Sequence, residues 1–353
     1  MRRQLSHFDR LVRYRPLVSI VRSILGGLTS VPRLAGILRS ACGKGLIPKK
    51  IWKFFPVESQ FEVVLPKGES FMYAVTHGDA VGKGLYWQGL ESLDEEFEVF
   101  YRLSAHSSSI LDIGANTGVY PLIACAANRQ ASVTAFEPVP AVYDRLVENV
   151  AVNGFKNRCV TRREAVSDKV GTAQLIVPPG LVPLEASLID SRSLEDRQSE
   201  DISVPTMTID HRFRNTVVDL VKIDVEGFED LVLRGMLQVL DRDRPVLIIE
   251  HHTNSPSDKL DLLLGDVGYQ LYRIKSDGTT GKVNGFRVGV RDHYLCVHHR
   301  RMVEVKAALP LPEDGMEDEE AAGNKAQLSV KFSPAGSIAL CLLETQLGYG
   351  HSR

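Results

Sequence analysis

The sequence predicts an α/β protein built on a mostly parallel sheet with helices on both faces. Short apolar runs, of a length typical of buried strands, alternate with longer segments of helical periodicity. The first of these runs, Ser109–Ile113, leads into a turn with two glycines and then into a helical segment. Strands and helices in alternation favour a sheet that is buried on both faces.

The elements follow one another along the chain. The predicted strands are Ser109–Ile113, Ser132–Phe136, Val160–Arg163, Val217–Ile223, Pro245–Glu250, Tyr269–Ile274 and Tyr294–His298. The predicted helices are Tyr86–Ser104, Thr117–Asn128, Pro140–Asn153, Gly227–Leu240 and Ser257–Leu264. A strand-rich lead-in is expected over Phe61–Gly84, and a hairpin-like insertion over Gly171–Ile209. Because little helical sequence separates the last two strands, we expect them to form an antiparallel edge.

Composition indicates a globular chain with a basic head. With 353 residues, 44% of them hydrophobic, the chain has room for one large α/β domain and appendages. The net charge is -2, yet residues 1–50 hold eleven Lys or Arg and one acid, which leaves 31 basic and 43 acidic residues in the rest. An acidic body disfavours nucleic acid as a partner. Five cysteines without a C-x-x-C pair favour a reducing, cytoplasmic location.

Three regions are predicted: a basic N-terminal segment (1–60), a main domain (61–305), and an acidic linker with a tail (306–353). In the first region, apolar residues alternate with arginines between Arg10 and Leu25. This amphipathic pattern fits a helix that lies on an anionic membrane surface, and equally a helix that packs on the main domain. The apolar stretch Leu17–Leu28 is shorter than the roughly 20 residues of a bilayer span.

The turn between Asp112 and Gly118 is the strongest functional feature. Gly114 and Gly118 allow close approach of a ligand, and Asn116 tolerates an unusual turn conformation. The turn follows a strand, where open α/β sheets bind ligands. Its G-x-x-x-G spacing differs from the G-x-G-x-x-G of dinucleotide folds, and Asp112 suits a cofactor with a cationic amino group better than a phosphate. A tight turn without a ligand is the alternative.

The end of the next predicted strand strengthens the case for a cofactor. Glu137 stands there, nineteen residues after Gly118. An acid in this position can accept hydrogen bonds from both hydroxyls of a ribose. Two acids at successive strand ends, with a glycine turn between them, are more specific than either alone.

Together these motifs resemble the FkbM-type methyltransferase family. The resemblance covers roughly Leu90–Cys296 and rests on Leu111–Gly118, Ala135–Pro140, Leu146–Asn153, Ala165–Asp168, Gly171, Val221–Glu229 and Ile248–Glu250. It implies a class I methyltransferase (Rossmann-like) fold with a seven-stranded sheet and an antiparallel last strand, and S-adenosylmethionine as methyl donor. By position, Asp112, Gly114, Asn116 and Gly118 would surround the amino-acid part of the cofactor. Glu137 would hold the ribose, and Ala165, Val166 and Ser167, ending the third strand, would border the adenine.

The acceptor side needs a base, because a sugar or aliphatic hydroxyl is a poor nucleophile; such a base contributes about 10²–10⁴-fold. Asp224 and Glu226 alternate near the end of the fourth predicted strand and can face the same side. Capping of the next helix is the alternative for Glu226. His251 is a further candidate base. A metal bound by these groups has no H-x-x-x-H spacing to support it, so we assign no metal ligand.

The function predicted from sequence is O-methylation of a sugar or glycan hydroxyl, because the family includes enzymes that act on glycans and on polyketide hydroxyls. A non-glycan small molecule, such as a polyketide-like or lipid hydroxyl, is the alternative acceptor. An inert cofactor-binding scaffold is the alternative from another class of protein. A nicotinamide-dependent oxidoreductase is disfavoured, since the chain lacks the dinucleotide glycine pattern. The sequence does not determine an oligomeric state.

Overall fold

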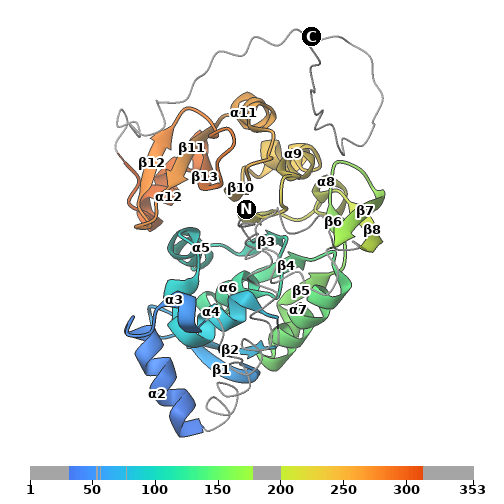
Figure 1. Ribbon diagram of the computed structural model, residues 1–353. Coiled ribbons are helices and arrows are strands. Elements are labelled where there is room, and N and C mark those ends of the chain that lie inside the picture. The colour runs from blue at the N-terminus through green and yellow to red at the C-terminus, as the bar shows by residue number, and fades with distance from the viewer. Residues whose placement is uncertain (1–31, 53–54, 56, 77, 178–199, 313–353) are drawn as a thin grey trace, which may run out of the picture.

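The computed structural model describes residues 32–52, 55, 57–76, 78–177 and 200–312 (Figure 1). Its centre is an eight-stranded sheet with the order β12-β11-β13-β10-β9-β3-β4-β5. The strands are β3 (Ser109–Ile113), β4 (Ser132–Phe136), β5 (Cys159–Arg162), β9 (Leu220–Ile223), β10 (Val246–His251), β11 (Tyr269–Ile274), β12 (Thr280–Val283) and β13 (Asp292–His298).

The strand directions confirm the class I methyltransferase fold. From β10 to β5, every neighbouring pair is parallel. The last strand, β13, is antiparallel and lies between β10 and β11. The predicted antiparallel pairing of the last two strands is therefore confirmed, but they do not form the edge. An eighth strand that the sequence did not predict, β12, pairs with β11 and forms the edge instead.

Helices cover both faces of the sheet, as the alternating pattern predicts. Alternate strand residues point to opposite faces. Ile110, Val133 and Leu220 join one buried core with residues of α5 (Glu96–Ser104), α6 (Val119–Ala127) and α7 (Pro140–Val152). The neighbouring residues Leu111 and Val221 join a second core with α9 (Glu229–Arg234), α10 (Leu237–Arg242) and α11 (Ser257–Asp266). In Figure 1, α6 and α7 lie on one side of the central strands, and α9 and α11 lie on the other.

Two predicted helices are broken by glycines. The segment predicted as one helix over Gly227–Leu240 forms α9 and α10, with Gly235 between them. A Cβ at Gly235 would collide with the carbonyl oxygen of Ser167, so this residue packs where a side chain has no space. The segment predicted over Tyr86–Ser104 divides into α4 (Ala80–Gln88), a short 3-10 helix and α5. Gly89 ends α4 with a φ of 68°, outside helical values.

The strand-rich lead-in is confirmed as a hairpin of β1 (Ser59–Val64) and β2 (Ser70–Val75). Asn149 of α7 joins it to the glycine turn: its Oδ1 accepts from the amide of Ala74 at 2.8 Å, and its Nδ2 donates to the carbonyl of Thr117 at 2.9 Å. The hairpin is thus fixed against the main sheet. Before it come α2 (Pro32–Gly43) and α3 (Lys49–Trp52).

The predicted insertion is a second small sheet, in which β7 (Gly171–Val177) pairs antiparallel with β8 (Glu200–Met207). The amphipathic stretch before residue 26, the acidic run 313–320 and the tail lie outside the described residues. Within the described part of the chain, no helix is both long and apolar enough to cross a bilayer.

Candidate active site

The glycine turn after β3 is held against the end of β4. The amides of Gly114 and Ala115 donate to the carbonyl of Phe136 at 3.0 and 2.8 Å. Gly114, Asn116 and Gly118 have φ values of 85°, 50° and 95°. These left-handed conformations explain the residue types, because glycine adopts them freely and asparagine tolerates them.

Packing within the protein also requires the two glycines. A Cβ at Gly114 would collide with the carbonyl oxygen of Asp224, and one at Gly118 would lie 2.7 Å from Cδ1 of Leu146. The sequence predicted space for a ligand, whereas these contacts show close approach of the turn to the end of β9 and to α7. Because Gly114 has no side chain, the backbone of Asp224 can lie directly beside the turn.

We expect Gly114→Ala to destabilise the protein by about 2–5 kcal/mol, because it adds an overpacking cost to the cost of a left-handed backbone. Gly154→Ala is the matched control: Gly154 has a φ of 67°, with no atom within 4 Å of the added Cβ. The control should lose only about 1–2 kcal/mol. Chemical denaturation of both variants measures the difference, and equal losses would contradict the collision.

Asp112 and Glu137 are buried at the ends of adjacent strands. Glu137 accepts from the amides of Asn116 and Val139 at 3.0 and 2.9 Å. Among the described residues, neither carboxyl oxygen of Asp112 has a hydrogen-bond partner. Burial raises the pKa of each carboxyl to about 7, although the two amides oppose this at Glu137 and Lys222 opposes it at Asp112. A buried carboxyl without donors is costly, so Asp112 fits a site for a cationic amino group.

A buried lysine stands between the acids. Lys222 is 2% exposed, and its Nζ lies 3.2 Å from Oδ2 of Asp224 and 4.4 Å from the centroid of the Tyr120 ring. Burial disfavours its charge, but Asp224, Glu96 and Asp112 outweigh burial and raise its pKa. Burial likewise disfavours the charge of Asp224, yet Lys222 and His252 hold its pKa well below the ordinary value. Lys222 and Asp224 therefore form a lasting ion pair.

The structure places His251 away from this ion pair. Its Nδ1 lies 3.0 Å from the carbonyl of Val290, its Nε2 lies 2.9 Å from Oγ of Ser257, and its ring stacks on Phe286. This geometry corrects the prediction that His251 is the base. Strand β10 extends through His251, so its side chain lies on the opposite face from that of Glu250.

His252, the next residue, lies where a base was expected, beside Asp224. Nε2 of His252 lies 3.4 Å from Oδ1 of Asp224, and its Nδ1 lies 3.1 Å from Oε2 of Glu226. Burial lowers the pKa of the imidazole, but Asp224, Glu226 and Glu250 outweigh it and raise the pKa above 6.5. The structure thus brings together Asp224, Glu226 and His252.

Glu226 lies in the turn before α9, with a φ of 55° and a side chain that is 79% exposed. Glu226 does not cap α9, whose N-cap residue is Phe228, with no side-chain capping hydrogen bond among the described residues. The exposed carboxylate of Glu226 lies 3.1 Å from Nδ1 of His252 and can contact a molecule that enters from solvent.

The expected position of Ala165, Val166 and Ser167 is wrong. The third strand, β5, ends at Arg162, and Ala165–Val166 (β6) pairs with β8 in the small separate sheet. The amide of Ser167 donates to the carbonyl of Met207 at 2.9 Å. A contact between these residues and adenine stays a prediction, but it cannot arise from the end of the third strand.

One buried network beside the turn has no local sequence motif that predicts it. The hydroxyl of Tyr73 donates to Oδ2 of Asp79 at 2.9 Å and lies 2.6 Å from Oγ1 of Thr117. Burial raises the pKa of Asp79 to about 6, although the amide of Gly82 opposes this. The network ties the amino-terminal hairpin to the turn.

A sheet of this order has the class I methyltransferase fold, and it carries acids at the carboxyl ends of β3, β4 and β9. Residues 112–271 match the model of the methyltransferase FkbM domain. Over this stretch, which is less than half of the chain, the protein is similar to FkbM-type methyltransferases, and this similarity supports S-adenosylmethionine as its cofactor.

Two relatives of this chain are also named as methyltransferases. Methyltransferase sdnD of Sordaria araneosa is 27% identical over 203 residues, which cover 48% of this chain and 76% of that protein. Hexuronic acid methyltransferase AglP of Haloferax volcanii is 30% identical over 156 residues, which cover 43% of this chain and 59% of that protein. The match thus spans less than two thirds of AglP.

Solved structures show weaker likeness. Methyltransferase FkbM from Methylobacillus flagellatus KT has a TM-score of 0.35 and 15% identity, over 54% of this chain and 43% of that one. A SAM-dependent methyltransferase from Agrobacterium tumefaciens has a TM-score of 0.38 and 13% identity, over 69% and 71%. The fold assignment rests on the strand order of the chain itself.

Proposed function

We propose that this chain transfers the methyl group of S-adenosylmethionine to a hydroxyl oxygen of a sugar or glycan. The observation that carries the proposal is the pair formed by Asp224 and His252, 3.4 Å apart, beside the glycine turn. This pair offers a proton acceptor next to the donor site, as transfer to a hydroxyl requires.

On the donor side, the cofactor supplies an electrophilic methyl group when it is bound. Asp112 would bind its amino group through the two carboxyl oxygens that lack donors. Gly114, Asn116 and Gly118 would shape the turn around the amino-acid part, and Glu137 would accept from the ribose hydroxyls. Only the ionised form of Asp112 attracts a cation, and the buried position would strengthen its attraction to the amino group.

On the acceptor side, the hydroxyl proton would pass to Nδ1 of His252. The present neighbour of this nitrogen is the exposed carboxylate of Glu226, which can make way for an acceptor and then hydrogen-bond to it. Nε2 stays beside Asp224, whose negative charge stabilises the protonated ring. Asp224 is thus a positioning residue, and His252 is the base.

The similarity to AglP supports a sugar as the acceptor, since that relative is named for hexuronic acid. The small-molecule hydroxyl remains the second candidate acceptor. Incubation of the purified chain with S-adenosylmethionine and matched panels of glycosides and of polyketide-like or lipid alcohols tests this choice. Mass spectrometry should show one added CH2 unit on a glycoside, with the methyl group on oxygen.

Methylation of the non-sugar panel alone would overturn the sugar acceptor and leave methyl transfer standing. Binding of S-adenosylmethionine without any product would favour the inert scaffold.

Peripheral contact of residues 1–50 with an anionic membrane belongs to the same proposal. Ile37 and Leu46 expose apolar side chains to solvent, while Arg39 lies over the rings of Phe61 and Tyr86. Wild-type protein should sediment with phosphatidylglycerol vesicles, and Ile37→Ser with Leu46→Ser should sediment less. Equal recovery of both proteins with the vesicles would contradict contact through this surface.

A further inference from the structure

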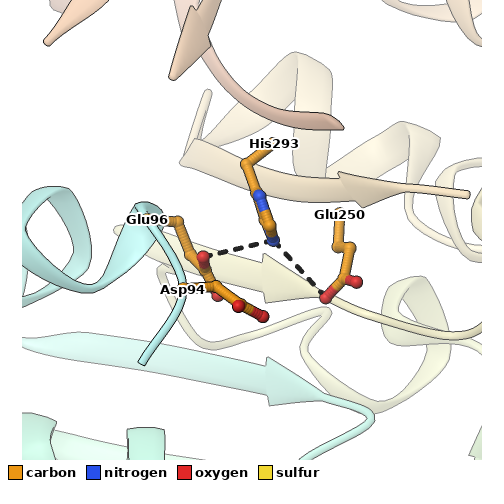
Figure 2. Close-up of side chains that lie close together, drawn as sticks. All are labelled: Asp94, Glu96, Glu250 and His293. Atoms are coloured by element: carbon orange, nitrogen blue, oxygen red, sulfur yellow. Dashed lines mark ion pairs between the residues drawn. The ribbon is translucent and has the colours of Figure 1, made fainter. Parts of the chain in front are cut away.

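A second polar cluster lies beside the proposed acceptor site. It consists of Asp94, Glu96, Glu250 and His293 (Figure 2). Nε2 of His293 lies 3.2 Å from Oε2 of Glu96 and 3.6 Å from Oε2 of Glu250. One ligand-type atom from each of the four residues lies within 4.8 Å of all the others. Four side chains from three parts of the chain therefore converge on one point.

The fold fixes the positions of these side chains. Glu250 and His293 are direct partners in the antiparallel pairing of β10 with β13. Glu96 begins α5, which packs against the core beneath β9, and Asp94 precedes it by two residues. The side chains of Glu96, Glu250 and His293 are 2%, 3% and 5% exposed, whereas that of Asp94 is 53% exposed. Three buried groups and one accessible group thus form a cluster that reaches the surface at Asp94.

Three buried polar atoms of this cluster lack hydrogen bonds within the described residues, although ion pairs join His293 to Glu95, Glu96 and Glu250. In the part of the chain that the structure describes, neither ring nitrogen of His293 makes a hydrogen bond, nor does Oε2 of Glu96. Their short separations are ion-pair contacts without hydrogen-bond geometry. Buried polar atoms without hydrogen bonds are rare in proteins, and a shared ligand would satisfy them. Nε2 of His293 and Oε2 of Glu96 are atoms that a shared cation would use.

The charge around the cluster also favours a cation. Asp94, Glu96 and Glu250 supply three carboxylates, and Glu95 lies 3.4 Å from Nδ1 of His293. Arg291 contacts Oε1 of Glu250 and Oδ2 of Asp94, which leaves free the oxygen of Glu250 that faces His293. The four carboxylates thus outnumber Arg291 and His293, two positive groups that contact them.

We propose that Asp94, Glu96, Glu250 and His293 bind one divalent cation. Three carboxylates and one imidazole suit a hard or borderline ion of the Mg²⁺, Mn²⁺ or Zn²⁺ class. Oε1 of Glu250 lies 3.5 Å from Nε2 of His252, so the ion lies next to the proposed base. Its use in attracting the acceptor oxygen rests on the proposed function, whereas its binding does not.

Titration of chelator-treated protein with MnCl₂, followed by the loss of the electron paramagnetic resonance signal of free Mn²⁺, tests the site. Wild-type protein should bind one ion per chain. Glu96→Gln and His293→Gln should weaken binding by at least about 10-fold, since each removes a ligand atom. Asp94→Asn changes an exposed side chain and so leaves the fold intact, and it should weaken binding as well.

Glu98→Gln on the same helix is the matched control, because Glu98 pairs with Arg102 outside the cluster. It should bind Mn²⁺ as wild type does. A second grouping, Asp224 with Glu226 and His252, has metal-ligand spacing too. Loss of Mn²⁺ in Glu226→Gln, with retention in Glu96→Gln and Asp94→Asn, would overturn the proposal in favour of that grouping. Absence of binding by wild type to Mn²⁺, Mg²⁺ and Zn²⁺ alike would overturn it outright.

This readout is independent of methyl transfer. Mn²⁺ bound at the four residues without methylation of any sugar would leave the site standing and contradict the proposed function. Methylation of a sugar in the presence of chelator, by protein that binds no ion, would support the proposed function and contradict the metal site.

Discussion

Asp224→Asn is expected to lower kcat by about 10²–10⁴-fold, with a much smaller effect on the affinity for S-adenosylmethionine. Asp224 lies 3.4 Å from His252 and stabilises its protonated form. The variant keeps the shape of the side chain and loses the charge. Asp241→Asn, an exposed aspartate of α10, is the matched control and should behave as wild type.

The pH profile separates this role from a structural one. In wild type, kcat should rise as pH rises through the pKa of His252, which lies above 6.5, because the base acts unprotonated. Without the negative charge of Asp224 that pKa falls, so the rise should move to lower pH in the variant. A profile and a kcat that match wild type would contradict the proposed pair.

Asp112→Asn is expected to weaken binding of S-adenosylmethionine by about 10- to 10²-fold and to stabilise the free protein at alkaline pH. The carboxylate that binds a cationic amino group is lost, and a charged hydrogen bond of this kind contributes about 1.5–3 kcal/mol. Isothermal titration calorimetry measures the first effect. Unchanged affinity would show that the amino group binds elsewhere.

The stability effect follows from the raised pKa of Asp112. Its folded-state value of about 7 exceeds the ordinary 3.8, so the folded protein retains a proton between these values and loses stability as pH rises through that window. Ionisation above pH 7 then costs up to about 4 kcal/mol at 1.36 kcal/mol per pH unit. Asparagine stays neutral, so the melting temperature should rise at pH 8 and change little at pH 4. An equal change at both pH values would contradict this cause.

The strand pattern was enough to predict that Asp112, Glu137 and Asp224 lie at one edge of the sheet. Asp112 and Glu137 each end a short apolar run, and the parallel order β9-β3-β4 brings the carboxyl ends of these runs to one edge of the sheet. Asp224 follows β9 directly, so it reaches the same edge. Local sequence predicts such a site well, because each residue is placed by its own strand.

The acceptor side could not be predicted in the same way. The choice between His251 and His252 depends on whether β10 ends one residue earlier or later, since one step along a strand reverses the face. The position of Ala165 depends on pairing with β8, which lies about 40 residues further on. Glu96 and His293 meet only because β13 inserts beside β10, and no local motif encodes that contact.

Titration calorimetry of S-adenosylmethionine with wild type, Asp112→Asn and Glu137→Gln tests the central claim most directly. The claim is that the cofactor lies at the carboxyl ends of β3 and β4. Wild type should bind one molecule per chain, and each variant should bind at least about 10-fold more weakly, because each loses one charged contact. Wild-type affinity in both variants would contradict the claim and move the donor pocket to another part of the molecule.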